Sequence, residues 1–182
     1  MSASTRKLAS FLSKLRYGDL PPAVIERTKE LFGDWLGCAT LGGGSQSVEA
    51  LADFAMRMGP ADGPCEIFAL RRHSSPYFAA LLNGASSHLA EQDDIHRLAG
   101  IHPAVVVFPA ALAVAQERRS SGRDFIVAAV AGYEAGARIG AYLGRSHYQR
   151  FHATGTVGTM AAASAAAKLL GSNVSLMLHA LG

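Results

Sequence analysis

Apolar residues recur at three- and four-residue spacing along most of the chain, a pattern that predicts helices rather than strands. The first helix has its apolar face on Leu8, Phe11, Leu12 and Leu15, and Ser4 or Thr5 can cap it. The same spacing, between glycine and proline breaks, predicts seven further helices. They span about residues 22–41, 48–58, 76–90, 104–119, 124–143, 156–170 and 173–182. We therefore expect a mainly α fold, a packed multi-helix domain.

Four features interrupt or mark this pattern. Residues 65–70 form the best strand candidate, and we expect at most a short strand pair there. Pro109 lies inside a predicted helix and should kink it or force a local break. A loop is expected over residues 146–155. Gly132, Gly136 and Gly140 lie on one helical face, which favours a close helix crossing over a ligand site.

Composition narrows the class of protein. With 49% hydrophobic and 17% charged residues, the 182-residue chain is not intrinsically disordered and suits about one domain. A net charge of +3 without a basic tract argues against nucleic-acid binding. The longest apolar run, Ala104–Ala115, is shorter than the ~20 residues that span a bilayer. Cys38 and Cys65 form no CxxC pair, which fits a cytoplasmic protein without disulfides.

Ionisable residues gather in two segments that hold five of the seven histidines. These residues are His88, Glu91, Asp93, Asp94, His96, Arg97 and His102, followed by His147, Arg150 and His152. Imidazoles transfer protons near neutral pH, and neighbouring carboxylates orient them. Structural explanations also exist, because Asp93 or Asp94 can cap a helix or turn and His88 can be a hydrogen-bonded core residue. The sequence alone leaves both explanations open.

Metal and cofactor motifs are absent from the sequence. The carboxylates and histidines of the first segment could supply metal ligands, but no HExxH spacing is present, so we expect no metal. Gly42-Gly43-Gly44 matches neither GxxxxGK[ST] nor GxGxxG, which argues against nucleotide binding. No GxSxG motif or cysteine–histidine signature points to a covalent hydrolase.

The chain resembles the N-terminal part of the MmgE/PrpD family, which includes 2-methylcitrate dehydratases, cis-aconitate decarboxylases and an iminodisuccinate epimerase. Three features carry the resemblance. They are Asn83-Gly84-Ala85 through His88, the acidic EQDD followed by His102-Pro103, and Phe151-His152 before GTVGTMAAASAAAKLLG. Trp35-Leu36-Gly37-Cys38 before a glycine-rich break also agrees. The similarity extends over nearly the whole chain.

The resemblance implies a mostly helical domain that carries most of the site and a second α/β domain that completes it. Residues 1–182 would then be the N-terminal helical domain, apparently truncated, since the last helix reaches Gly182 with apolar residues still running. Later lysine and tyrosine positions of the family's pocket are missing, which leaves open whether the chain is active alone. Homodimers are also implied, with no metal or organic cofactor.

The resemblance also transfers site residues. It places catalytic groups on five positions, namely His102, His152, Glu91, Asp93 and Asp94. His102 and His152 are expected to transfer protons and contact carboxylates, with the acidic residues orienting them or binding a substrate hydroxyl. Substrate contacts are expected from His96, Arg97 and Thr154. Ile95-His96 stands where some relatives have a threonine, which argues mildly against the decarboxylase branch.

We therefore expect a lyase that, in full-length form, dehydrates a 2-methylcitrate-like hydroxy polycarboxylate by removing a proton next to a carboxylate. One alternative is an epimerase of an iminodisuccinate-like amino dicarboxylate, and another is a cis-aconitate-type decarboxylase. A third, of a different class, is a noncatalytic helical fragment or dimerisation module. The dehydratase, epimerase and decarboxylase hypotheses all need positive groups for substrate carboxylates and a positioned acid or base.

Overall fold

The computed structural model describes residues 2–60 and 62–182, and helices dominate them. The α-helices are α1 (Ala3–Lys14), α2 (Pro22–Leu41), α3 (Gln46–Met58), α4 (Pro76–Leu89), α5 (Ala104–Arg118), α6 (Gly122–Tyr148), α7 (Ala153–Leu169) and α8 (Val174–Ala180). A two-stranded antiparallel sheet pairs β1 (Cys65–Ile67) with β2 (Arg72–Ser74). The expected mainly α fold with one short strand pair is confirmed.

Helix starts follow from local capping. The hydroxyl of Ser2, rather than that of Ser4 or Thr5, accepts the Thr5 backbone N–H and caps α1. Ser121 and Asp124 form a reciprocal capping box at the start of α6. Because caps and prolines act over three or four residues, the sequence locates most helix starts to within a few positions.

The hairpin depends on an asparagine from a helix. Phe68–Leu70 does not continue the strand but forms a 3₁₀ turn, and the Asn83 side chain from α4 stabilises it. The Asn83 amide donates a 2.7 Å hydrogen bond to the Glu66 carbonyl, and its oxygen accepts the Phe68 N–H at 3.0 Å. The asparagine of the family-like Asn83-Gly84 pair therefore has a structural role.

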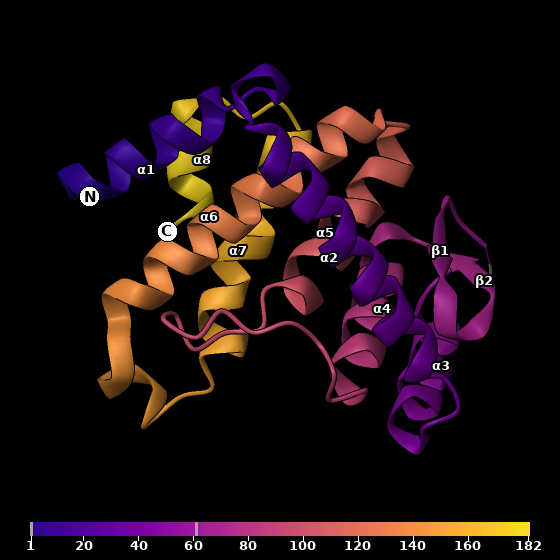
Figure 1. The fold of residues 1–182 in the computed structure, drawn as a ribbon. Helices are drawn as coiled ribbons and strands as arrows, with labels where there is room; N and C mark the ends of the chain where they lie inside the picture. The colour runs from indigo at the N-terminus through magenta and orange to yellow at the C-terminus, as the bar shows by residue number, and fades with distance from the viewer. Residues whose placement is uncertain (1, 61) are drawn as a thin grey trace.

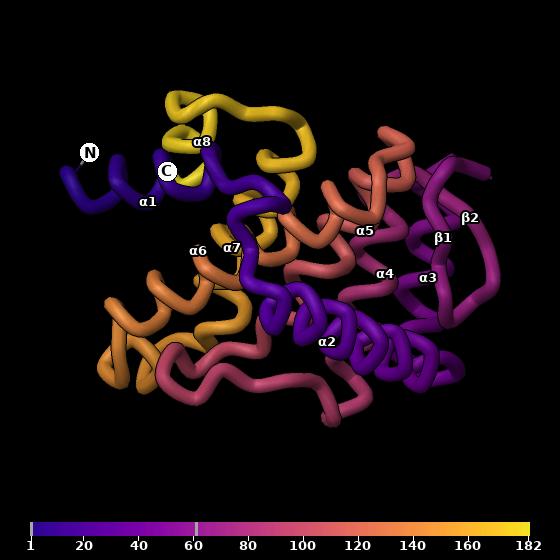
Figure 2. The backbone as a smooth tube through the Cα atoms, turned by 45° about the horizontal axis from the view of Figure 1, so that its top comes forward, coloured from indigo at the N-terminus to yellow at the C-terminus, as the bar shows by residue number. Residues whose placement is uncertain are grey.

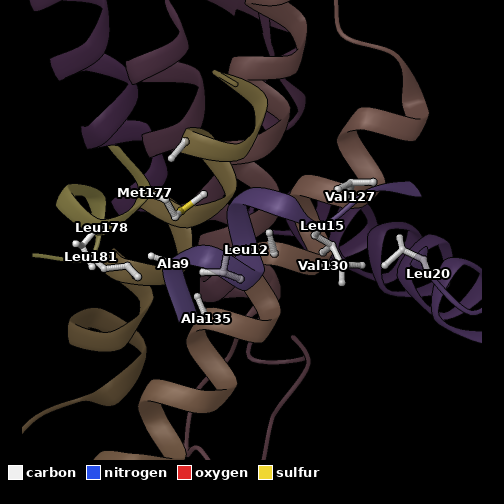
Figure 3. Packing of buried hydrophobic residues seen from close by; sticks show 12 residues of the cluster. Ala9, Leu12, Leu15, Leu20, Val127, Val130, Ala135, Met177, Leu178 and Leu181 are labelled. Carbon is white, nitrogen blue, oxygen red and sulfur yellow. The ribbon is translucent and has the colours of Figure 1, made fainter. Parts of the chain in front are cut away.

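The core lies where α5 packs against α4, α6 and α7 (Figure 1). Trp35 of α2 is fully buried beside Phe108 of α5, and its indole N–H donates to the Ser87 hydroxyl at 3.1 Å. A second cluster joins the two ends of the chain. In it, Leu12 of α1 packs with Met177 of α8 and residues of α6 (Figure 3).

Pro109 does not break α5, which runs as one helix from Ala104 to Arg118. Of the two predicted outcomes, a kink or a local break, the break is therefore wrong. The Val105 carbonyl, which a residue with an N–H at position 109 would bond, lies against Gly84 of α4. A Cβ built on Gly84 would lie 3.1 Å from that oxygen. The backbone of α4 thus approaches α5 closely at the turn before Pro109.

The glycine face of α6 is a close helix crossing, as predicted. A Cβ at Gly132 would lie 2.8 Å from Val107, and one at Gly140 would lie 2.7 Å from Ala99. Segments of the same chain cover this face, so it offers no surface for self-association. None of the helices in the described residues combines the length and hydropathy that a bilayer crossing needs.

The predicted loop over residues 146–155 is wrong at both ends. A break at Gly144, with φ of 64°, bends α6, and a helical turn then continues to Tyr148. At the other end, α7 begins at Ala153 rather than at Thr156. The break at Gly144 uses a backbone conformation that glycine adopts without strain. Because α7 begins at Ala153, His152 lies at the N-terminus of this helix.

Candidate active site

Segment 90–103, between α4 and α5, runs along the ends of α6 and α7 (Figure 1 and Figure 2). Within it, the His96 N–H donates to the Ile101 carbonyl at 2.9 Å, which closes a tight loop. The buried Ile101 side chain and the Ala99–Gly140 contact fix this loop against α6. These contacts fix the backbone that carries the polar side chains of the segment.

A nearly buried carboxylate of this segment lies between two histidines. Asp93 Oδ2 is 2.9 Å from His88 Nδ1 and 3.1 Å from His102 Nδ1. The Asp93 side chain is only 2% exposed, whereas those of His88 and His102 are 37% and 26% exposed. One carboxylate thus lies against two imidazoles that remain partly exposed.

The two contacts differ in quality. The nitrogen–oxygen pair of His88 and Asp93 satisfies hydrogen-bond geometry. The 3.1 Å contact of His102 is short enough for an ion pair but poorly aligned. The buried His102 Nδ1 therefore has no hydrogen-bond partner among the described residues. Buried polar atoms normally find a partner, so this nitrogen is the unusual feature of the cluster.

A third imidazole completes the cluster. His152 caps α7 by position, and its ring stacks on that of His88 with centroids 5.7 Å apart. The rings of His88 and His102 have centroids 5.3 Å apart. The structure thus brings together Asp93, His102 and His152 of the predicted set. It adds His88, which the sequence left undecided although it lies in the family-like motif.

Asp94 makes different contacts from its neighbour Asp93. One Asp94 oxygen accepts the Ala104 N–H at the start of α5 at 2.9 Å, and the other accepts the Tyr133 hydroxyl at 2.8 Å. Burial raises the pKa of the Asp94 carboxyl, and these two hydrogen bonds oppose that rise. Burial also raises the pKa of Tyr133, which keeps its hydroxyl protonated as a donor.

Asp94 and His96 face a separate hollow. Together with Arg27, Asp34 and Tyr133 they line a cavity of about 520 Å³ between α2, the segment and α6. The His96 ring nitrogen Nδ1 also accepts the Ala99 N–H at 3.2 Å, so the ring stabilises its own loop. These two residues are therefore not gathered with the three histidines.

The other predicted residues have simpler surroundings. Glu91 and Arg97 are exposed, and within the described chain their side chains form no hydrogen bond or ion pair. Glu91 takes a left-handed backbone conformation with φ of 52°. Thr154 is buried, and its hydroxyl accepts the His102 N–H at 3.1 Å. Thr154 thus fixes the backbone of His102.

Nucleophilic and metal chemistry also have defined candidates. Cys38 and Cys65 are free and buried, and burial raises the pKa of both thiols, which disfavours the reactive thiolate. One ring nitrogen each of His88 and His102 and a carboxylate oxygen of Asp93 lie within 4.8 Å of one another. These three are a possible ligand set for a metal ion. The arrangement as a whole can exchange protons and bind anionic groups.

Comparisons with known proteins agree with these features. The sequence profile of the MmgE/PrpD N-terminal domain matches residues 6–182. The cis-aconitate decarboxylase-like protein oryM of Aspergillus oryzae is 35% identical over 92% of this chain and 36% of its own length. Cis-aconitate decarboxylase of Aspergillus terreus is 34% identical, and that of Mus musculus 26%, each over the whole chain and 38% of the relative. The chain spans little more than a third of these relatives, and it belongs to the MmgE/PrpD family.

Proposed function

We propose that the protein containing this chain decarboxylates a cis-aconitate-like tricarboxylate. The names of the similar proteins support this reaction, since the fungal and mouse relatives described above are cis-aconitate decarboxylases or resemble one. Dehydration, the leading expectation from the sequence, becomes the second candidate. The presence of Ile95-His96 in place of a threonine therefore carries less weight than the similarity over the whole chain.

The cluster of Asp93 with His88 and His102, and of His152 stacked on His88, is the observation that carries the proposal. In decarboxylation the bond from carbon to a carboxylate breaks, CO₂ leaves, and the electron pair stays on the carbon. That carbon must then gain a proton from a positioned acid. Imidazoles change protonation near neutral pH and suit this transfer. His102 and His152 are the proposed groups for proton transfer and carboxylate contact.

Asp93 and His88 are proposed as positioning residues. Asp93 accepts a hydrogen bond from His88 and contacts His102, so it sets the position of one proposed catalytic ring directly. His88 stacks on His152 and so supports the other. A carboxylate that orients an imidazole also stabilises the protonated ring. Both arrangements serve a step in which a histidine holds a proton next to a carbanion.

The remaining predicted residues receive different proposed roles. Asp94 is proposed to hold the segment against α5 and α6, since both of its oxygens are engaged there. Arg97 and Glu91 are exposed, so they are free to approach substrate from the rim, Arg97 by pairing with a carboxylate.

His88 is 37% exposed, and we propose that parts of the protein beyond this chain cover the cluster. A homodimer, implied by the family, would appear in light scattering as twice the monomer mass.

A substrate panel tests the reaction. The full-length protein would be incubated with cis-aconitate, 2-methylcitrate and an amino dicarboxylate, and CO₂ release and product formation would be followed. We expect CO₂ release from cis-aconitate and from neither of the other two acids. Loss of water from 2-methylcitrate without CO₂ would restore the dehydratase, and epimerisation of the amino acid would favour the epimerase. A folded protein that turns over none of them would support a noncatalytic module.

A further inference from the structure

We propose that His88, Asp93 and His102 form a binding site for a divalent transition-metal ion, with Zn²⁺ as its probe. The ion would not be a cofactor of the reaction. It would instead bind to side chains that the proposed reaction needs. Binding of the ion is independent of which acid the protein takes as substrate.

The distances fit a tetrahedral ion. Zinc bonds of about 2.0–2.2 Å to nitrogen and oxygen place neighbouring ligand atoms about 3.3 Å apart. The carboxylate oxygen of Asp93 is already 2.9 Å and 3.1 Å from the two Nδ1 atoms. One ligand atom from each of the three residues lies within 4.8 Å of the other two. Small side-chain rotations would therefore let all three reach one ion.

The chemistry of the three donors suits zinc rather than magnesium or calcium. Two imidazoles and one carboxylate match the nitrogen and oxygen ligands of zinc, whereas magnesium and calcium prefer oxygen alone. Three protein ligands leave a fourth position for water, as in open zinc sites. The partial exposure of His88 and His102 gives an ion access from solvent.

The unpartnered ring nitrogen of His102 gives a second, independent reason to propose a metal site. His102 Nδ1 is buried and has no aligned hydrogen-bond partner among the described residues. A bond to a metal ion would satisfy this atom, which Asp93 does not. Sequence spacing gave no sign of the site, because the ligands lie at positions 88, 93 and 102 and match no metal motif.

An ion in this position would inhibit the proposed reaction. It would occupy His102, the proposed proton-transfer group, and the carboxylate that positions it. This consequence rests on the proposed function, whereas binding itself does not. Inhibition and binding are therefore measured separately, and a failure of one is distinguishable from a failure of the other.

Calorimetric titration tests the binding. The untagged full-length protein, stripped of metal, would be titrated with ZnCl₂, and one ion per chain is expected. His88→Gln and Asp93→Asn should each weaken the affinity at least tenfold. The matched control is His147→Ala, because His147 bonds the Thr156 hydroxyl at 2.7 Å outside the cluster. Co²⁺ in place of Zn²⁺ should give the visible absorption of a tetrahedral site.

Three outcomes would overturn the site. They are the absence of saturable binding, an affinity unchanged by His88→Gln in a variant with a native melt, and equal weakening by His147→Ala. An octahedral Co²⁺ spectrum would contradict the proposed tetrahedral geometry. His88 is partly exposed, so its glutamine variant should fold even if Asp93→Asn does not. Zinc that binds as proposed without inhibiting CO₂ release would confirm the site and count against the role of His102.

Discussion

The backbone N–H of His102 donates a 3.1 Å hydrogen bond to the hydroxyl of Thr154, across 52 positions of sequence. This bond joins segment 90–103 to the first turn of α7. Since His152 lies two residues before Thr154, the bond also sets the spacing of the two proposed catalytic histidines. A threonine expected to touch substrate thus links the two parts of the site.

Thr154→Val tests this link. Valine keeps the shape of threonine but leaves the His102 N–H without an acceptor, which costs about 1–3 kcal/mol in a buried position. We expect a lower free energy of unfolding in urea and a reduced kcat of the full-length protein. Thr154→Ser restores the hydroxyl and should recover most of both. If valine and serine behave alike, the hydrogen bond does not position His102.

The helices were predictable because their signals are local. Periodic apolar residues, Pro22 in a first turn and Ser121 as a cap act within a few residues, so the sequence locates them well. The local rule for proline allowed a break at Pro109 that α5 does not have, and the Val105 carbonyl one turn earlier lies close to Gly84 of α4. Gly144 was missed as an internal break because helical turns lie on both sides of it.

The site was predictable only in part, because contacts between residues far apart in the sequence decide its arrangement. Family-like motifs pointed to Asp93, Asp94, His102 and His152, but gave the two adjacent aspartates equal standing. Tertiary contacts separate them, because Asp94 meets Tyr133 from 39 positions away whereas Asp93 meets the histidines. The sequence could place His88 in the motif, but not its stacking on His152.

Gly140→Ala tests the anchoring of the loop on α6. The added methyl group would lie 2.7 Å from the Ala99 side chain and 2.8 Å from its carbonyl, so backbone must move. We expect a loss of about 1–3 kcal/mol in the free energy of unfolding. Gly33→Ala is the matched control, since Gly33 lies in α2 with open space around it. It should stabilise the protein by up to about 1 kcal/mol.

Urea unfolding of both variants gives the comparison. An alanine at position 140 that is as stabilising as the one at position 33 would mean that the loop does not press on α6.

Asp94→Asn tests the buried carboxyl through pH. Since burial raises its pKa above the ordinary 3.8, the folded protein binds this proton more tightly than the unfolded chain. The contribution of Asp94 to stability therefore falls as pH rises from about 3.8 through the raised value. Asparagine does not titrate, so the stability of the original protein relative to the variant should decrease over this window.

Unfolding free energies of both proteins between pH 4 and 7 measure this difference. Asp53→Asn, which removes an exposed carboxylate of α3 in place of a buried one, is the control. A relative stability that instead increases with pH would mean that the hydrogen bonds from Ala104 and Tyr133 outweigh burial.

The kcat of His102→Ala and His152→Ala for CO₂ release from cis-aconitate, beside their thermal melts, tests the central claim most directly. Loss of a positioned acid or base typically lowers the rate by about 10²–10⁴-fold. We predict such losses in the full-length protein with melts close to the original. His147→Ala, close in sequence but outside the cluster, should keep its rate. If His147→Ala is as damaging as His152→Ala, or if the melts of the first two variants collapse with their activity, the catalytic assignment is contradicted.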